Sequence, residues 1–436
     1  MRFFIGLLLL TIACIALQLE LLVIMLVLLA VLYLATRRTS HYWAHAVTAT
    51  RRCNRTIAEV GDVAQVDVAL SHTSNLPIVW LLIEDLIPPD SFGKPHSPLV
   101  IDGDRVRVLK LVPGQGHTWS YKIHCRRRGY FQIGPLVLET GDMFGLERTF
   151  RVLAEPNYLM VLPQVVPLEA YDIASRRPLG EIVLSHRLFE DPTRIRGVRE
   201  YQPGDAQNQI HWHATARTGK LHSKIYEPSC LAGATLLIDF HESAYGAADE
   251  PVRSELAITA AASIANTLYE AGEQIGLLSN GRDAVDRIRT EGWQGDSRTR
   301  EASRRQTMMQ ATSDRLRPVT VATSKSPDRM INMLHALARL EKTSGLSFVE
   351  LLASYAYTLP RDATVIAIIG RVSMELAVAL GNLRHLGFAI TAVINCYDIE
   401  HYARASGLLL NEGIQTRHLR EEASIPSICA RQVVMA

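Results

Sequence analysis

The sequence has little cysteine and little net charge, and each shortage excludes a class of protein. There are 6 cysteines in 436 residues. None forms a C-x-x-C pair, so a disulfide-dense scaffold, a zinc ribbon and a thioredoxin-type motif are excluded. Lys and Arg number 46 against 44 Asp and Glu, for a formal net charge of +2. Dedicated nucleic-acid-binding domains are usually strongly basic, so we expect no nucleic-acid partner.

Common catalytic motifs are also missing. The chain has no Walker A sequence, no G-x-G-x-x-G, no G-x-S-x-G and no H-E-x-x-H. Hydrophobic residues make up 48% of the chain and charged residues 21%, which excludes wholesale disorder. The length allows two or three domains. We therefore expect a folded, multidomain protein that is not an enzyme.

A long apolar run begins the chain. Residues Phe3 to Ala35 are interrupted only by Thr11, Gln18, Glu20 and Tyr33, and the run exceeds the ~20 residues that one membrane span needs. A helical hairpin over residues 1–36, turning at Gln18 to Glu20, would place Arg2 and the following arginines together on the cytoplasmic side. It would also lift Glu20 out of the hydrocarbon. We predict two spans in the lipid bilayer with cytoplasmic soluble domains; one tilted span and a cleaved signal peptide are the alternatives.

Short strand-like runs fill residues 37–162. Turn residues such as Pro88-Pro89, Gly103 and Pro113-Gly114 separate them. Runs at this spacing favour an antiparallel β-sandwich. The predicted strands are a run marked by Val63, Val66 and Val68, then Ile78–Ile87, Val106–Val112, Thr118–Cys125 and Tyr130–Glu139.

Apolar strands alternate with helical patterns over residues 231–436. This order predicts βαβ units and a doubly wound, mainly parallel sheet covered on both faces. The fold class is thus multidomain, α/β plus all-β. The predicted strands are Ala234–Phe240, Gln274–Ser279, Ala363–Ile369 and Phe388–Ile394, and the helices are Arg253–Glu273, Arg329–Glu341, Phe348–Thr358, Met374–Leu386 and Glu400–Leu410.

A polar insertion, residues 282–327, interrupts the α/β pattern. From Arg282 to Ser326 it holds ten Lys or Arg against six Asp or Glu and few large apolar residues. We interpret it as a solvated or mobile insertion. The alternative is a basic surface that binds an acidic partner or anionic lipid.

The segment 163–230 is the most distinctive. It contains Val198-Arg199-Glu200-Tyr201-Gln202-Pro203-Gly204-Asp205, then Ile210-His211-Trp212 and Ala216-Arg217-Thr218-Gly219-Lys220-Leu221. Pro203-Gly204 suits a type II turn. The mixed charges predict a partly buried network that fixes the segment to the α/β domain. The alternative is a surface that docks a partner. A catalytic dyad of Glu200 and Asp205 is disfavoured because no nucleophile accompanies it. The predicted network residues are Arg199, Tyr201, Pro203, Gly204, Asp205, Trp212 and Arg217.

Two histidines in this segment allow a metal hypothesis. In a strand, His211 and His213 share one face. A metal site would need a third ligand, such as His222 or His186, and no feature of the sequence brings these together.

These motifs resemble the bacterial family called domain of unknown function 58 (DUF58). Arg127-Arg128-Gly129-Tyr130 and Asp142-Met143-Phe144-Gly145-Leu146 are similar to the family as well. The resemblance implies a C-terminal von Willebrand factor A-like domain and anchoring in the cell inner membrane. It also implies partnership with a MoxR-type AAA+ ATPase. The family has no established molecular activity, so the resemblance implies an association and no reaction.

Metal-binding A-domains carry Asp-x-Ser-x-Ser after their first strand. The corresponding residues here are Asp239-Phe240-His241-Glu242-Ser243, so the first hydroxyl is replaced by His241. The strand Ala363–Ile369 is followed by Gly370-Arg371 and no carboxylate. We therefore predict a degenerate site at Asp239 and Ser243 and no cofactor, with Mg²⁺ as the alternative.

The sequence predicts a membrane-anchored, non-enzymatic adaptor or scaffold for the AAA+ ATPase. The alternatives are a metal-dependent hydrolase or Mg²⁺-binding A-domain receptor using Asp239 and Ser243, and binding of anionic lipid or a partner through the insertion.

Overall fold

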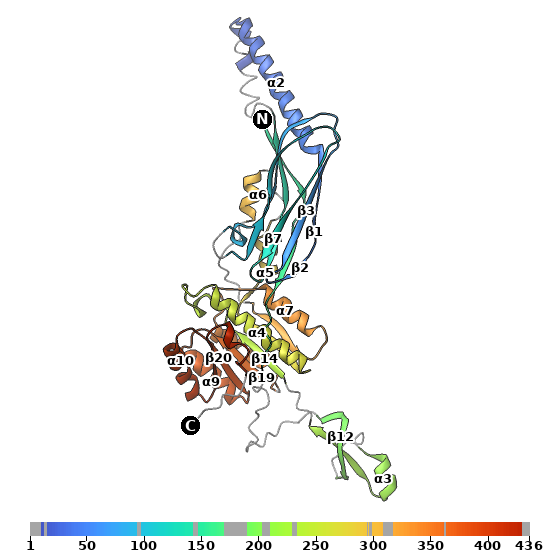
Figure 1. Ribbon diagram of the computed structural model, residues 1–436, viewed down its shortest axis with the longest axis vertical. Coiled ribbons are helices and arrows are strands. Elements are labelled where there is room, and N and C mark those ends of the chain that lie inside the picture. The colour runs from blue at the N-terminus through green and yellow to red at the C-terminus, as the bar shows by residue number, and fades with distance from the viewer. Residues whose placement is uncertain are drawn as a thin grey trace.

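The computed structural model describes residues 10–12, 15–93, 97–142, 147–169, 190–202, 210–228, 233–293, 295, 299–307, 317–361 and 363–429. Along the chain these form an N-terminal helix, a β-sandwich, a small hairpin and an α/β domain (Figure 1). Four residues with predicted roles lie outside the described residues: His186, Pro203, Gly204 and Asp205.

The helix α2, Glu20–His45, leads from the apolar run into the sandwich. It begins just after Gln18, which has a positive φ of 55°, and it continues past residue 36. Near its end Trp43 is buried, and the Ser40 hydroxyl lies 2.7 Å from that of Thr149. Among the described residues α2 is the one helix long and apolar enough to cross a membrane. This supports membrane association, while two spans and their sidedness stay predictions.

The sandwich is built mainly from antiparallel strands. Its sheets have the orders β1-β3-β7-β5, β10-β9-β4-β6 and β2-β11-β8, with β2 and β11 parallel. Alternate residues of β3 are buried, as a sheet with one face on a core requires. The strands are β1 Val47–Cys53, β2 Ile57–Glu59, β3 Val63–His72, β4 Ile78–Asp85, β5 Leu99–Asp102, β6 Val106–Leu111, β7 Gly116–Cys125, β8 Gly129–Ile133, β9 Leu136–Gly141, β10 Arg148–Ala154 and β11 Asn157–Leu162.

The single strand predicted over Tyr130–Glu139 is wrong. The structure has two strands there, β8 and β9, in different sheets. Gly134 between them has φ +96°, a left-handed conformation that suits glycine. Pro135 has no backbone N–H to donate to a ladder. A glycine and a proline at this point therefore end one strand and redirect the chain into the other sheet.

The α/β domain contains a six-stranded sheet in the order β17-β15-β14-β19-β20-β21. Every neighbouring pair is parallel except β15 and β17. The strands are β14 Gly233–Ile238, β15 Gln274–Ser279, β17 Val319–Ser324, β19 Thr364–Ile369, β20 Ile390–Asn395 and β21 Gln415–Leu419.

Helices cover both faces of this sheet. Leu236 and Ile238 of β14 pack with α4 and α7, whereas Leu237 packs with α8, α9 and α10. Residues of one strand thus pack into two cores, one on each face of the sheet. This explains why the strands are continuously apolar. The helices are α4 Val252–Glu270, α7 Arg329–Arg339, α8 Phe348–Tyr355, α9 Met374–His385 and α10 Ile399–Asn411.

The prediction that residues 282–327 form a solvated insertion is wrong for their described part. β17 is a strand of the main sheet, and β16, Arg282–Asp283, pairs with β18, Leu340–Glu341. Two short helices, α5 Ala284–Glu291 and α6 Arg300–Gln306, complete the segment. Its charges have partners elsewhere: Arg282 and Arg287 lie 3.2 and 2.5 Å from Glu341. The amino-acid composition includes these arginines but does not show which carboxylates they pair with.

Candidate functional site

The carboxyl ends of β14 and β19 lie where the strand order of the main sheet reverses. The chain leaves β14 towards β15 on one side and later returns to its other side at β19. Ligands of open α/β sheets collect at the carboxyl ends of strands at such a reversal. Asp239 lies there and is buried, and its Oδ1 accepts hydrogen bonds from the Asn280 amide at 3.0 Å and the His241 N–H at 3.1 Å.

The loop after Asp239 is held by its own side chains. The His241 Nδ1 accepts the Ser243 N–H at 3.2 Å and lies 2.7 Å from the Ser243 hydroxyl. His241 thereby caps the short 3-10 turn Glu242–Ala244. The pair has the residue types of a nucleophile and base, yet its contacts are those of a helix cap.

The residues at this edge do not fit a magnesium ion. Burial raises the pKa of Asp239. Its Oδ1 is already used by two N–H donors, and β19 is followed by Gly370 and Arg371 instead of a second carboxylate. Within the described ranges, no group of three or more His, Cys, Asp or Glu is placed to hold a metal.

The distinctive segment forms a hairpin. β12, Glu190–Glu200, pairs antiparallel with β13, His222–Pro228, and α3, Trp212–Thr218, lies between them. The strand expected around His211 and His213 is wrong. His211 instead caps α3 by accepting the Ala214 N–H at 3.0 Å, and Gly219 ends the helix with φ +71°. His213 is therefore a helical residue and does not share a strand face with His211.

Two of the predicted network residues of this segment, Arg199 and Tyr201, make contacts inside the hairpin. Arg199 donates to the carbonyl of Glu200 at 3.3 Å, and the Tyr201 N–H donates to the carbonyl of Leu221 at 2.9 Å. Arg217 is exposed in the last turn of α3. Fixation of the segment to the α/β domain stays a prediction.

The hairpin presents an exposed and partly apolar surface. Trp212 is 67% exposed, and Val198 and Leu221 are also exposed. Over the described residues 190–202 and 210–228, six Lys or Arg stand against four Asp or Glu, and Lys220 lies 3.3 Å from Glu200. Figure 1 shows the hairpin standing apart from the sandwich and the α/β domain. A large exposed aromatic side chain beside charges is typical of a protein interface.

The sandwich and the α/β domain are joined by a buried arginine. Arg128, just before β8, donates to the carbonyls of Leu337 and Leu340 at 2.5 and 2.9 Å. Its Nε lies 3.2 Å from a carboxylate oxygen of Glu255. The residue belongs to a motif that the sequence singled out, but its role in joining two domains could not be read there.

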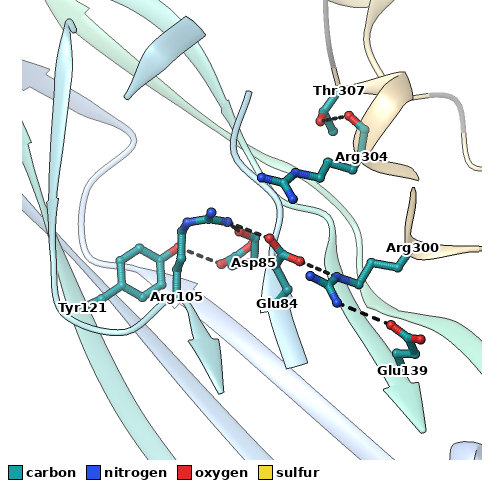
Figure 2. A network of polar contacts seen from close by, with 8 residues as sticks. All are labelled: Glu84, Asp85, Arg105, Tyr121, Glu139, Arg300, Arg304 and Thr307. Carbon is teal, nitrogen blue, oxygen red and sulfur yellow. Dashed lines mark hydrogen bonds and ion pairs between the residues drawn. The ribbon is translucent and has the colours of Figure 1, made fainter. Parts of the chain in front are cut away.

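A second junction links α6 to the sandwich (Figure 2). The Glu84 carboxylate, whose side chain is 1% exposed, meets Arg105 at 2.8 Å and the Arg300 Nε at 2.6 Å. Arg300 also lies 3.5 Å from Glu139. No sequence motif marks this cluster.

Comparisons with known proteins agree with part of the sequence interpretation. A family model described as "Protein of unknown function DUF58" matches residues 197–347, which confirms the resemblance over that range. "Uncharacterized protein YeaD" of Bacillus subtilis (strain 168) is 26% identical over 246 residues, covering 56% of this chain and 58% of the relative. The chain thus spans less than two thirds of the length of that relative.

Solved structures give only weak similarities. The CARDB domain of PF1109 from Pyrococcus furiosus is 10% identical with a TM-score of 0.17, over 27% of this chain and 94% of that one. The PapD-like domain 7 of human CEP192 is 11% identical with a TM-score of 0.18, over 26% and 83%. Scores this low do not establish a shared fold.

Proposed function

We propose that this protein is a membrane-anchored adaptor without catalytic activity that binds an AAA+ ATPase of the MoxR type. In this proposal the chain crosses the cell inner membrane twice, its soluble domains are cytoplasmic, and its C-terminal domain is von Willebrand factor A-like. The hairpin β12–α3–β13 is the docking element. The observation that carries the proposal is the exposure of Trp212 on that hairpin.

Trp212 has the properties of an interface anchor. Tryptophan is among the residues most enriched at binding hot spots, because burying its ring removes a large apolar area from water. The residue is 67% exposed in this chain and lies within the range that matches the family. Arg217 of the same helix is exposed as well, and charged side chains beside an aromatic anchor are typical of the polar rim of an interface.

The contacts between domains support an anchoring role. α2 continues from the apolar run into the sandwich, where Ser40 meets Thr149. The sandwich is joined in turn to the α/β domain by Arg128 and Arg300. Buried polar contacts at both junctions hold the domains in a defined arrangement. The α/β domain is therefore held at a defined position relative to the membrane helix.

The edge at Asp239 favours neither a hydrolase nor a metal-dependent receptor. His241 and Ser243 are engaged in capping a turn, and a second carboxylate is missing after β19. The sheet, with helices on both faces and one antiparallel edge strand, supports the A-like assignment.

Replacing Trp212 by alanine should abolish docking while leaving the fold intact. In an affinity pull-down of the full chain from native membranes, we expect recovery of the AAA+ ATPase to fall at least about tenfold, as for a hot-spot residue. Tyr357→Ala is the matched control, because Tyr357 is an exposed aromatic residue of the α/β domain, at 86%. Equal recovery with Trp212→Ala and wild type, or no AAA+ ATPase with wild type, would contradict the proposal.

A further inference from the structure

A cavity of about 530 Å³ lies between the sandwich and the α/β domain. Ligand pockets commonly occur at domain interfaces and measure roughly 300–1,000 Å³. Tyr397 and Arg420 line the cavity, just beyond the carboxyl ends of β20 and β21. The first residues of α4 line it as well, and Arg126 contributes from the sandwich. Both domains thus supply side chains to one space.

The cavity is rich in arginine. Five arginines line it against three glutamates, Glu255, Glu421 and Glu422. Arg128 is engaged with Glu255, and Arg253 donates to Asn395 and to the carbonyl of Arg420. Arg126 and Arg420 are exposed, and neither side chain forms an ion pair with another residue in the described part of the chain. Two guanidinium groups, one from each domain, are therefore available to a phosphate or carboxylate, which guanidinium binds through paired hydrogen bonds.

The remaining walls suit a flat or apolar group. Val252, Leu256 and Thr259 of α4 line the cavity. The Tyr397 ring is 61% exposed, with Arg420 and Arg253 at 5.0 and 5.5 Å from its centroid. Aromatic rings and guanidinium planes are the surfaces on which proteins stack nucleobases. The positive end of the α4 dipole also favours an anion at this place.

We propose that this cavity binds a nucleoside phosphate, with the phosphate held by Arg126 and Arg420 and the base lying against Tyr397. The α/β domain, whose α4 lines the cavity, lies at the end of the sandwich opposite to α2 (Figure 1), so a soluble ligand fits this place and a membrane lipid does not. Because the ligand touches both domains, its binding favours their present arrangement over any separated one. The site is separate from the docking hairpin and does not depend on the adaptor role.

Calorimetric titration of the full chain in lipid nanodiscs tests the site. The probes are AMP, GMP, CMP and UMP, with adenosine as the compound that lacks phosphate and inorganic phosphate as the one that lacks a base. We expect at least one monophosphate to bind at least tenfold more tightly than either comparison compound. The double variant Arg126→Gln/Arg420→Gln should weaken that binding at least tenfold. Arg404→Gln, which removes an exposed arginine of α10, should leave it unchanged.

Several results would overturn the assignment. Absence of binding by all four monophosphates would do so, as would equal binding to wild type and to the double variant. If inorganic phosphate bound as tightly as the nucleotides, the cavity would be a general anion site and the proposed nucleotide site would be wrong. The two single variants and Tyr397→Ala guard against a folding defect, since each should weaken binding while the thermal unfolding midpoint is kept. Trp212→Ala should bind the nucleotide normally, which separates this site from the adaptor proposal.

Discussion

Replacing Arg51 by methionine should lower the thermal unfolding midpoint of the sandwich by roughly 10 °C or more, the equivalent of about 3–5 kcal/mol. Arg51 lies 2.6 Å from Asp85, and both side chains are only 1% exposed. The other oxygen of Asp85 accepts a hydrogen bond from the Tyr121 hydroxyl at 2.7 Å. Burial raises the pKa of Asp85, and Arg51 counters that rise. Without the Arg51 guanidinium, the Asp85 carboxylate would be left in the core without its ion-pair partner, and Arg105 would be its remaining electrostatic partner.

Arg55→Met is the matched control. Arg55 pairs with Asp62 at 2.7 Å, but the two side chains are 49% and 36% exposed. Solvent screens such a pair, so its loss should cost only about 0–1 kcal/mol. Unfolding of the full chain in detergent, followed by tryptophan fluorescence, compares the two variants. If both variants lowered the unfolding midpoint by similar amounts, the buried Arg51–Asp85 pair would contribute no more to stability than an exposed pair, which would contradict this prediction.

Arg300→Met should release α6 from the sandwich. Amide hydrogen exchange over Arg300–Gln306 is expected to accelerate on the order of 30-fold or more, since a buried pair that loses one partner is destabilised by several kcal/mol. Glu84 is 1% exposed and would keep only Arg105 at 2.8 Å (Figure 2). The remaining arginine explains why we expect this effect to be local and smaller than that of Arg51→Met.

Arg304→Met provides the comparison for this experiment. Arg304 is on the same helix and exposed, and in Figure 2 its guanidinium has no marked contact with Glu84 or Glu139. Its replacement should leave exchange over α6 nearly unchanged. Equal acceleration in both variants would mean that α6 is not held by Arg300, and the junction would then need another explanation.

The sequence predicted the central strands of the α/β domain but missed its two edges. β14 and β19 are buried on both faces, so their apolar runs mark them clearly. β21 reads Gln-Thr-Arg-His-Leu and β17 is half exposed. An edge strand has one neighbour and is open to water on its other side, so it needs no apolar run. The sequence of β17 therefore predicts part of a polar insertion instead of a strand.

The candidate sites were predictable only where neighbours in sequence are neighbours in space. Asp239, His241 and Ser243 do lie on one loop, as the pattern indicated. The Glu84–Arg300 contact joins residues 216 positions apart, and no local pattern reports such a pair. The exposure of Trp212 was not predicted either, because the mixed charges of the segment indicate a partly buried network that includes Trp212, whereas its side chain is 67% exposed.

The most direct test of the adaptor proposal is photo-crosslinking from the hairpin in native membranes. A photoreactive amino acid in place of Lys220, an exposed residue beside α3, should capture an AAA+ ATPase, whereas the same group in place of Arg404 should not. Failure to capture an AAA+ ATPase from position 220, or equal capture from both positions, would contradict docking through the hairpin.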